Sequence, residues 1–107
     1  MAEGIRLQSK LASYVIALRA ISNPYRLAVV YLLAHGSLRT RDLMQKIGIK
    51  QSLLVHHLNV LEQHGWVKKH RVGKHMAYSL EKKMFKKLAR LAKDTPFWSP
   101  QPASPKL

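Results

Sequence analysis

Hydrophobic residues recur at three- and four-residue spacing along the first part of the chain, a pattern typical of a helix with one apolar face. The pattern predicts a first helix from about Ile5 to Ile21. Asn23 is a favourable N-cap and Pro24 fits the first position of a helix, so a second helix is predicted from Pro24 to Ala34. This second helix is apolar nearly all round and is expected at the centre of the fold, closed by His35-Gly36 at a left-handed C-cap.

Two further amphipathic patterns lie close together in the middle of the chain. A third helix is predicted to begin at Thr40 or a neighbouring residue and to end at Gly48, and a fourth to run from about Lys50 to His64. Helices joined by so short a turn containing glycine cannot lie antiparallel, so they are expected to cross steeply, with the second projecting outward. This geometry predicts a helix-turn-helix.

Two strand-like runs follow, from Val67 to Arg71 and from His75 to Leu80, and predict a β-hairpin with a loop of about two to four residues around Gly73. A last amphipathic helix is predicted from about Glu81 to Lys93. Four prolines follow Asp94 and predict a disordered tail. We therefore expect one domain over residues 1–94 and a Pro-rich tail over residues 95–107.

The order of the elements predicts a fold class. Four helices, a two-stranded β-hairpin and a final helix make a mainly α-helical winged helix-turn-helix domain, which indicates reading of double-stranded DNA. The function expected from the order is therefore sequence-specific binding of duplex DNA by a transcriptional regulator.

Charge supports a polyanionic partner. The 107 residues carry 19 Lys and Arg against 5 Asp and Glu, a formal net charge of +14, which suits either nucleic acid or an anionic membrane. No apolar run approaches the roughly 20 residues of a membrane span, and the first four residues lack the order of a signal peptide, so a soluble intracellular protein is expected. Cysteine is absent, which removes disulfides, thiolate metal sites and thiol redox sensing.

Three segments resemble the ArsR/SmtB (arsenic-repressor-like) family of bacterial and archaeal repressors. They are LRAISNPYRL at residues 18–27, QSLLVHHLNVL at residues 51–61 and GWV at residues 65–67. The resemblance covers roughly Leu11 to Leu91. It implies a homodimeric repressor that blocks a promoter by occupancy, in the prokaryotic cytoplasm and associated with the nucleoid.

The resemblance also implies that the first and last helices pack across a two-fold axis. A domain of about 90 residues buries a limited fraction of its surface, so apolar stripes on the terminal helices need a partner. The alternative is that these side chains cover the domain's own core, and the two roles are compatible. The candidate dimerisation residues are Leu7, Leu11, Tyr14, Val15, Met84, Leu88 and Leu91.

DNA contacts are expected from two elements. In the recognition helix, Gln is suited to adenine, Ser to a phosphate or base edge, and Val to a thymine methyl. The recognition-helix candidates are Lys50, Gln51, Ser52, Val55, His56 and His57. In the wing, basic side chains flank a glycine that lets the loop turn near a phosphate backbone or minor groove. The wing candidates are Lys68, Lys69, Arg71, Gly73, Lys74 and His75.

Several positions depart from the family pattern or have an alternative interpretation. The family commonly has Ser or Thr where Lys50, Leu53 and Val55 stand, so base preference is not carried over. Leu54 is expected in the core. His57 matches a recurrent family histidine, and we expect a hydrogen-bonded packing residue or a phosphate contact. The lysines of the last helix are expected to form a solvated face.

No metal, cofactor or effector is predicted. Helix 3 lacks the family's thiolate pair, and the last helix lacks its carboxylate and histidine set. His70 and His75 would face each other if the hairpin loop were Val72-Gly73, but two ligands are too few for a metal. Our hypothesis is instead that protonation of His56, His57, His70 and His75 near pH 6 tightens DNA binding.

Other functions are weighed against the regulator. An enzyme is not expected, because the five acidic residues are scattered and no Ser/His/Asp grouping or Gly-rich phosphate loop occurs. The alternative function is a non-specific, chromatin-like DNA coat, or an adaptor that binds nucleic acid or protein through the same basic surface. A strong preference for one DNA sequence separates the regulator from this alternative.

Overall fold

A computed structural model describes the backbone of residues 2–93 and the side chains of residues 8–93. The predicted Pro-rich tail lies outside the described residues, as does the side chain of Leu7. The elements in chain order are α1 (Ala2–Ile21), α2 (Pro24–Leu33), β1 (Leu38–Arg39), α3 (Thr40–Ile47), α4 (Gln51–Gln63), β2 (Val67–Val72), β3 (His75–Leu80) and α5 (Lys82–Lys93). The fold is therefore the predicted winged helix-turn-helix.

The sheet has one strand more than the predicted hairpin. β1 pairs antiparallel with β3, opposite Tyr78 and Ala77, so the strand order is β1-β3-β2. Only Leu38 and Arg39 form β1, and two residues are too short for an alternating pattern to show. The third strand fixes the wing to the segment that leads into α3.

The ends of α2 illustrate one correct prediction and one correction. Asn23 caps the helix as expected, because its Oδ1 accepts the backbone N–H groups of Tyr25 at 2.9 Å and Arg26 at 3.1 Å. The predicted left-handed C-cap at His35-Gly36 is wrong. The helix ends at a right-handed Ala34, and Gly36 has a φ of 135°, outside the left-handed helical region.

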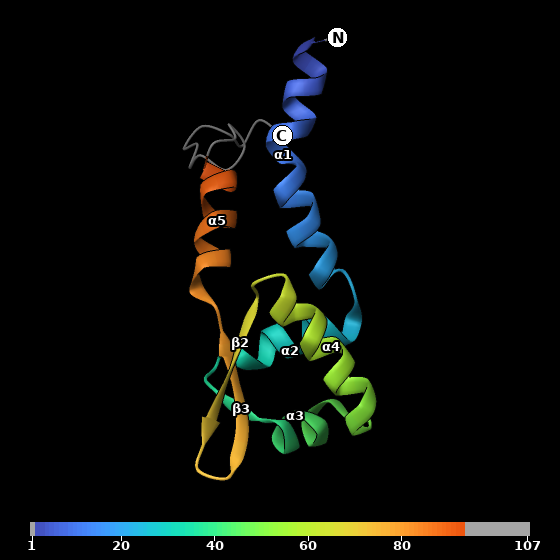
Figure 1. Cartoon of the computed structure of the whole chain (residues 1–107), viewed down its shortest axis with the longest axis vertical. Helices are drawn as coiled ribbons and strands as arrows, with labels where there is room; N and C mark the ends of the chain where they lie inside the picture. Colours follow the sequence, from blue (N-terminus) through green and yellow to red (C-terminus); the bar gives the residue numbers. More distant parts are fainter. Residues whose placement is uncertain (1, 94–107) are drawn as a thin grey trace, which may run out of the picture.

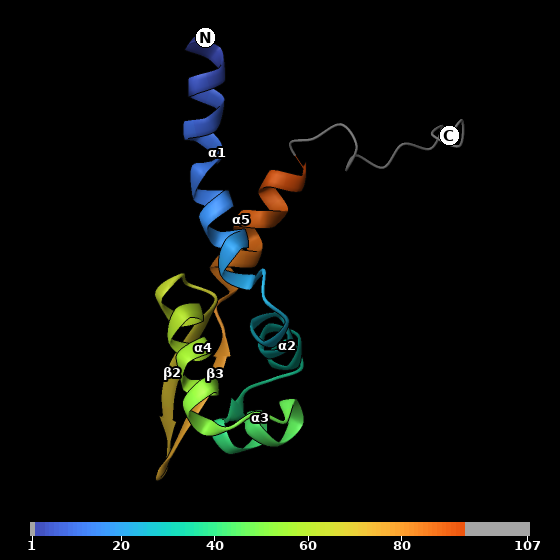
Figure 2. The ribbon, with the colours of Figure 1, turned by 90° about the vertical axis from the view of Figure 1, so that its right-hand side faces the viewer.

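The two ends of the molecule are built from different elements. The tip of the β2–β3 hairpin, α3 and the start of α4 lie together at one end, the lower end in Figure 1. α1 and α5 extend from the opposite end, as both Figure 1 and Figure 2 show. The helix-turn-helix and the wing are thus displayed away from the two terminal helices.

The core lies between α2, α4 and the sheet and centres on Trp66. This side chain is fully buried, and its indole Nε1–H donates to the Ala17 carbonyl of α1 at 2.9 Å. Its ring also meets Phe85 of α5 edge to face, with centroids 5.4 Å apart. One residue at the start of the wing therefore holds both terminal helices.

The turn after α4 directs Trp66 into the core. Gly65 has a φ of 79°, a left-handed conformation that glycine adopts without steric cost. The Trp66 N–H bonds the Leu61 carbonyl at 2.9 Å, and the Gly65 N–H bonds the Glu62 carbonyl at 3.1 Å. These two bonds form a Schellman motif, which ends α4 and starts β2.

The contacts of Trp66 generate a stability prediction. We expect Trp66→Phe to lower the free energy of unfolding by about 2 kcal/mol or more, because it removes a buried hydrogen bond and leaves a cavity. Tyr31→Phe is the control, since Tyr31 is 66% exposed and we expect a change within about 0.5 kcal/mol. Urea denaturation followed by circular dichroism measures both, and equal stability of the two variants would contradict the role given to Trp66.

Candidate nucleic-acid interface

The turn between α3 and α4 sets the orientation of the predicted recognition helix. α3 ends at Gly48, whose φ of 79° and ψ of 36° are left-handed and whose N–H bonds the Met44 carbonyl at 2.8 Å. One side of α4 packs into the core through Leu54, Leu58 and Leu61, which are fully buried. The first turn of α4 consequently faces solvent.

The predicted recognition residues fall into three groups by exposure. Lys50, Gln51, Ser52 and His56 are exposed, and Val55 is half-buried. His57 is only 6% exposed, so a direct contact of its side chain with DNA is not supported and the expected packing role is retained. Leu54 lies in the core as predicted.

Residues of α2 and α4 make hydrogen-bond and ring contacts with the His57 side chain. The Arg26 Nη1 lies 3.2 Å from the His57 Nδ1, and the His57 ring centroid lies 5.5 Å from that of Tyr25 and 5.2 Å from that of His56. A guanidinium group can only donate, so the Nδ1 accepts and carries no proton. Burial, then the Arg26 charge and His56, lower the pKa of His57 below its usual 6.5.

The wing is a hairpin of two six-residue strands joined by a two-residue loop. Val72 pairs with His75, so the loop is Gly73-Lys74, and Gly73 alone of the two has a positive φ, as in a type II′ turn. The condition under which His70 and His75 would face each other, a Val72-Gly73 loop, is therefore not met. His70 faces Ala77, and its Nε2 lies 3.2 Å from the Ser37 Oγ.

The side chains of the predicted wing residues are accessible to solvent, as a surface that contacts DNA requires. Every predicted wing residue is exposed, namely Lys68, Lys69, Arg71, Gly73, Lys74 and His75. The exposed surface of the wing is thus strongly basic.

Within residues 8–93, no group of three or more His, Asp or Glu side chains is arranged to hold a metal ion.

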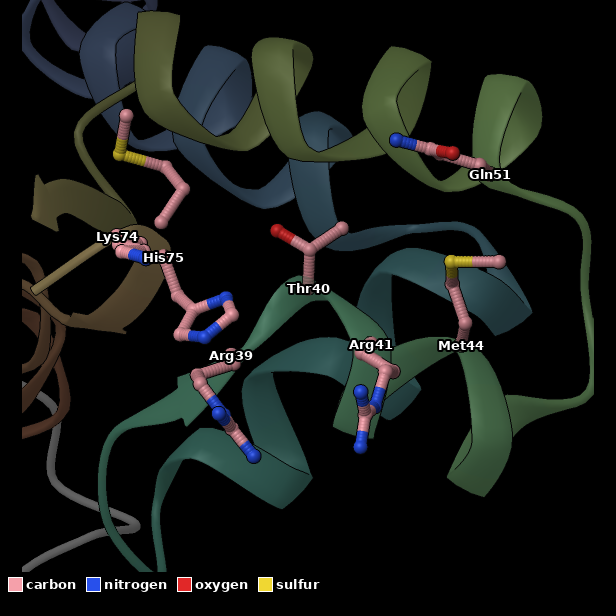
Figure 3. A pocket seen from close by; sticks show the side chains of 8 residues that line it. Arg39, Thr40, Arg41, Met44, Gln51, Lys74 and His75 are labelled. Carbon is pink, nitrogen blue, oxygen red and sulfur yellow. The ribbon is translucent and has the colours of Figure 1, made fainter. Parts of the chain in front are cut away.

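A hollow of about 450 Å³ lies between α3, the start of α4 and the hairpin. Its walls bring together residues from four segments of the chain (Figure 3), namely Arg39, Thr40, Arg41, Met44, Gln51, Lys74, His75 and Met76. Arg39 and Arg41 were missing from the predicted interface. Two arginines at the start of an amphipathic helix were the available signal, but nothing local placed them beside the wing.

The candidate dimerisation residues differ in their surroundings. On α1, Val15 is 49% exposed, whereas Leu11 and Tyr14 are half-buried. On α5, Met84 and Leu88 pack against the domain's own core, as the alternative interpretation predicted, and Leu91 is half-buried. Ile16 and Leu18 were not among the predicted dimerisation residues. They are 52% and 42% exposed and extend the apolar surface of α1.

These elements define a winged helix-turn-helix protein with a basic wing. A family model described as "Bacterial regulatory protein, arsR family" matches residues 23–69. The chain is 36% identical over 62 residues to the transcriptional repressor SdpR of Bacillus subtilis, a match that covers 58% of this chain and 69% of SdpR. This chain belongs to the arsR family, which consists of DNA-binding transcriptional regulators and not of enzymes.

Two further similarities agree. The HTH-type transcriptional regulator NmtR of Mycobacterium tuberculosis is 39% identical over 75 residues, which are 69% of this chain but only 62% of NmtR. The structure of the transcriptional repressor BigR from Xylella fastidiosa has a TM-score of 0.64 and 30% identity, covering 87% of this chain and 94% of BigR. Among the described residues, no helix is long and apolar enough to cross a membrane.

Proposed function

We propose that this chain is a homodimeric repressor that binds a specific sequence of duplex DNA and blocks a promoter by occupancy. The carrying observation is the end of the molecule where an exposed first turn of α4 lies beside an exposed basic hairpin. A helix of this kind fits the major groove, and a basic wing fits the adjacent backbone or minor groove. We place the protein in the prokaryotic cytoplasm, at the nucleoid.

The base contacts are assigned to the exposed first turns of α4. Gln51 is suited to bidentate hydrogen bonds with adenine, and Ser52 to a base edge or phosphate. Lys50 precedes the helix and is suited to the backbone, while half-buried Val55 and exposed His56 lie one turn further along. The wing lysines and Arg71 supply phosphate contacts that carry affinity without sequence information.

The dimer is assigned to the opposite end. Val15, Ile16 and Leu18 of α1 are all more than 40% exposed, and a cluster of large apolar side chains on one helix is a surface that a second copy would cover. A two-fold axis through this end would present two recognition helices to the two halves of an inverted repeat. Leu11, Tyr14, Met84, Leu88 and Leu91 would support that contact from the same pair of helices.

DNA selection from a random pool at about 150 mM salt tests this proposal, because non-specific binding is weak there while specific complexes persist. We expect enrichment of an inverted repeat with half-site centres about one helical turn apart. A flat pool with tight, salt-dependent binding would overturn the repressor and favour the non-specific coat or the adaptor.

The recognition helix generates a second expected result. We predict that Gln51→Ala relaxes the preference at one base pair of each half-site by about 1–3 kcal/mol, because a bidentate contact is lost. Gln63→Ala, at the exposed far end of the same helix, is the control and leaves the preference unchanged. Competition binding with operators that differ at single positions measures both variants, and an unchanged profile for Gln51→Ala would remove that residue from the interface.

A further inference from the structure

The hollow beside the wing gathers positive side chains from segments distant in sequence. Arg39 ends β1, Arg41 lies in the first turn of α3, and Lys74 lies in the hairpin loop. In Figure 3 the guanidinium groups of Arg39 and Arg41 extend to the same side, whereas Thr40 between them points toward α4. Both arginines therefore face one region of space.

Little within the protein neutralises these charges. The Asp42 Oδ2 lies 3.5 Å from the Arg39 Nε, and the two side chains are 33% and 40% exposed, so this ion pair is weak. The side chains of Arg41 and Lys74 form no hydrogen bond or ion pair with the residues that the structure describes. The hollow consequently has a surplus of positive charge and unused hydrogen-bond donors.

We propose that this hollow is a phosphate-binding site in which Arg39 and Arg41 hold a phosphate group and Lys74 closes it from the wing. A planar guanidinium matches phosphate oxygens with two parallel hydrogen bonds. The site rests on the proposed DNA-binding function, since its first source of phosphate is the backbone between the recognition helix and the wing. A free phosphate ester has the same chemistry and is the second source.

The salt dependence of DNA binding tests the backbone source. We expect the double variant Arg39→Gln, Arg41→Gln to reduce the slope of log K against log salt by about one to two per protomer, since each lost phosphate contact changes it by about 0.9. The control is Lys82→Gln, Lys83→Gln, which removes the same charge from α5 at the other end of the molecule and leaves the slope nearly unchanged. Arg41→Gln alone removes an exposed side chain and guards against misfolding of the double variant.

A second arm tests the free ester. Pyrophosphate is added at constant ionic strength, and the unfolding temperature is compared between the wild type and Arg41→Gln. A rise of about 2–4 °C in the wild type alone would show that the site takes free phosphate as well. An equal slope change in the arginine and lysine variants, with no pyrophosphate effect, would overturn the site. The DNA selection experiment tests the proposed repressor function separately, because an operator can be enriched whether or not Arg39 and Arg41 bind phosphate.

A second inference rests on a different observation. His57 is the one buried polar side chain that the described residues contain, and its partner Arg26 makes two contacts. The Arg26 Nη1 bonds the His57 Nδ1 on α4, and the Arg26 Nε donates to the Ala20 carbonyl at the end of α1. One guanidinium on α2 therefore joins the helix assigned to the dimer with the helix assigned to DNA.

We infer that Arg26 and His57 are positioning residues that hold α4 in its orientation relative to α1, and that a proton on His57 releases this link. The Nδ1 must be unprotonated to accept from Arg26, and an imidazolium there would repel the guanidinium. The titratable and charged groups against His57 are Arg26 and Tyr25 on α2 and His56 on α4.

The direction of the pH effect follows from these neighbours. Burial and the Arg26 charge lower the pKa of His57, so the link is intact above pH 6.5 and is lost as the pH falls through the lowered value. Other groups of the protein also contribute to the pH dependence of DNA binding. A variant of His57 is needed to separate its effect from theirs.

His57→Asn provides that separation, because its amide oxygen can accept from Arg26 but does not titrate. We expect the ratio of the dissociation constants for operator DNA, wild type over His57→Asn, to be near one at pH 8 and to reach about fivefold at pH 5.5. The matched control His35→Asn alters an exposed histidine outside the proposed interface and leaves the Arg26 link in place. A ratio that does not change with pH would overturn the inference.

A measurement on the wild type makes the test independent of how the variant folds. We expect the backbone amide signals of α4 and of the last turn of α1 to titrate in NMR spectra with the midpoint of the His57 ring. Amides that do not follow His57 would also overturn the inference. A purely structural role for His57 predicts no such shared midpoint.

Discussion

The position of the wing and of both terminal helices depends on the burial of Trp66. Its indole N–H bonds a carbonyl of α1, its ring packs against Phe85 of α5, and its own N–H completes the turn that ends α4. The first of these contacts joins residues 49 positions apart along the chain. Because an indole buried without a hydrogen-bond partner is costly, α1 and β2 cannot move independently. The geometry that separates the DNA-facing end from the terminal helices is therefore fixed in the core.

Local signals made much of the fold predictable. The start of α2 was predicted from Asn23-Pro24, whose side-chain cap acts within a few residues. The end of α3 was predicted from Gly48, which adopts a left-handed φ. β1 was missed because its two residues form a strand only by pairing with β3. The sequence left the hairpin loop at two to four residues around Gly73 for a similar reason, since the register is set by the pairing of Val72 with His75.

The exposure of candidate interface residues was predicted where it follows from helix periodicity, and their proximity to the wing was missed where it follows from long-range pairing. Gln51, Ser52 and His56 lie opposite the apolar side of α4, so their exposure was readable from spacing alone. Arg39 reaches the wing because β1 pairs with Ala77 and Tyr78, nearly forty residues later. The inward direction of His57 depends on Arg26 of another helix. Neither contact has a signature in the local sequence.

Arg26 lies between the end of the molecule that holds the basic hairpin and the end that holds the exposed apolar side chains of α1. The basic hairpin and hollow occupy one end, and the exposed apolar side chains of α1 extend from the other. In the proposed dimer, a change in how two copies pack at α1 would alter DNA affinity only through contacts that differ between two arrangements. The Arg26 guanidinium contacts the end of α1 and the middle of α4 at once, and its acceptor on α4 is an imidazole whose pKa is lowered from the usual 6.5 by burial and by the Arg26 charge. This contact has two discrete states, with and without a proton on His57, and a coupling between the two ends of the molecule requires two such states. The apolar packing around the contact has a single arrangement.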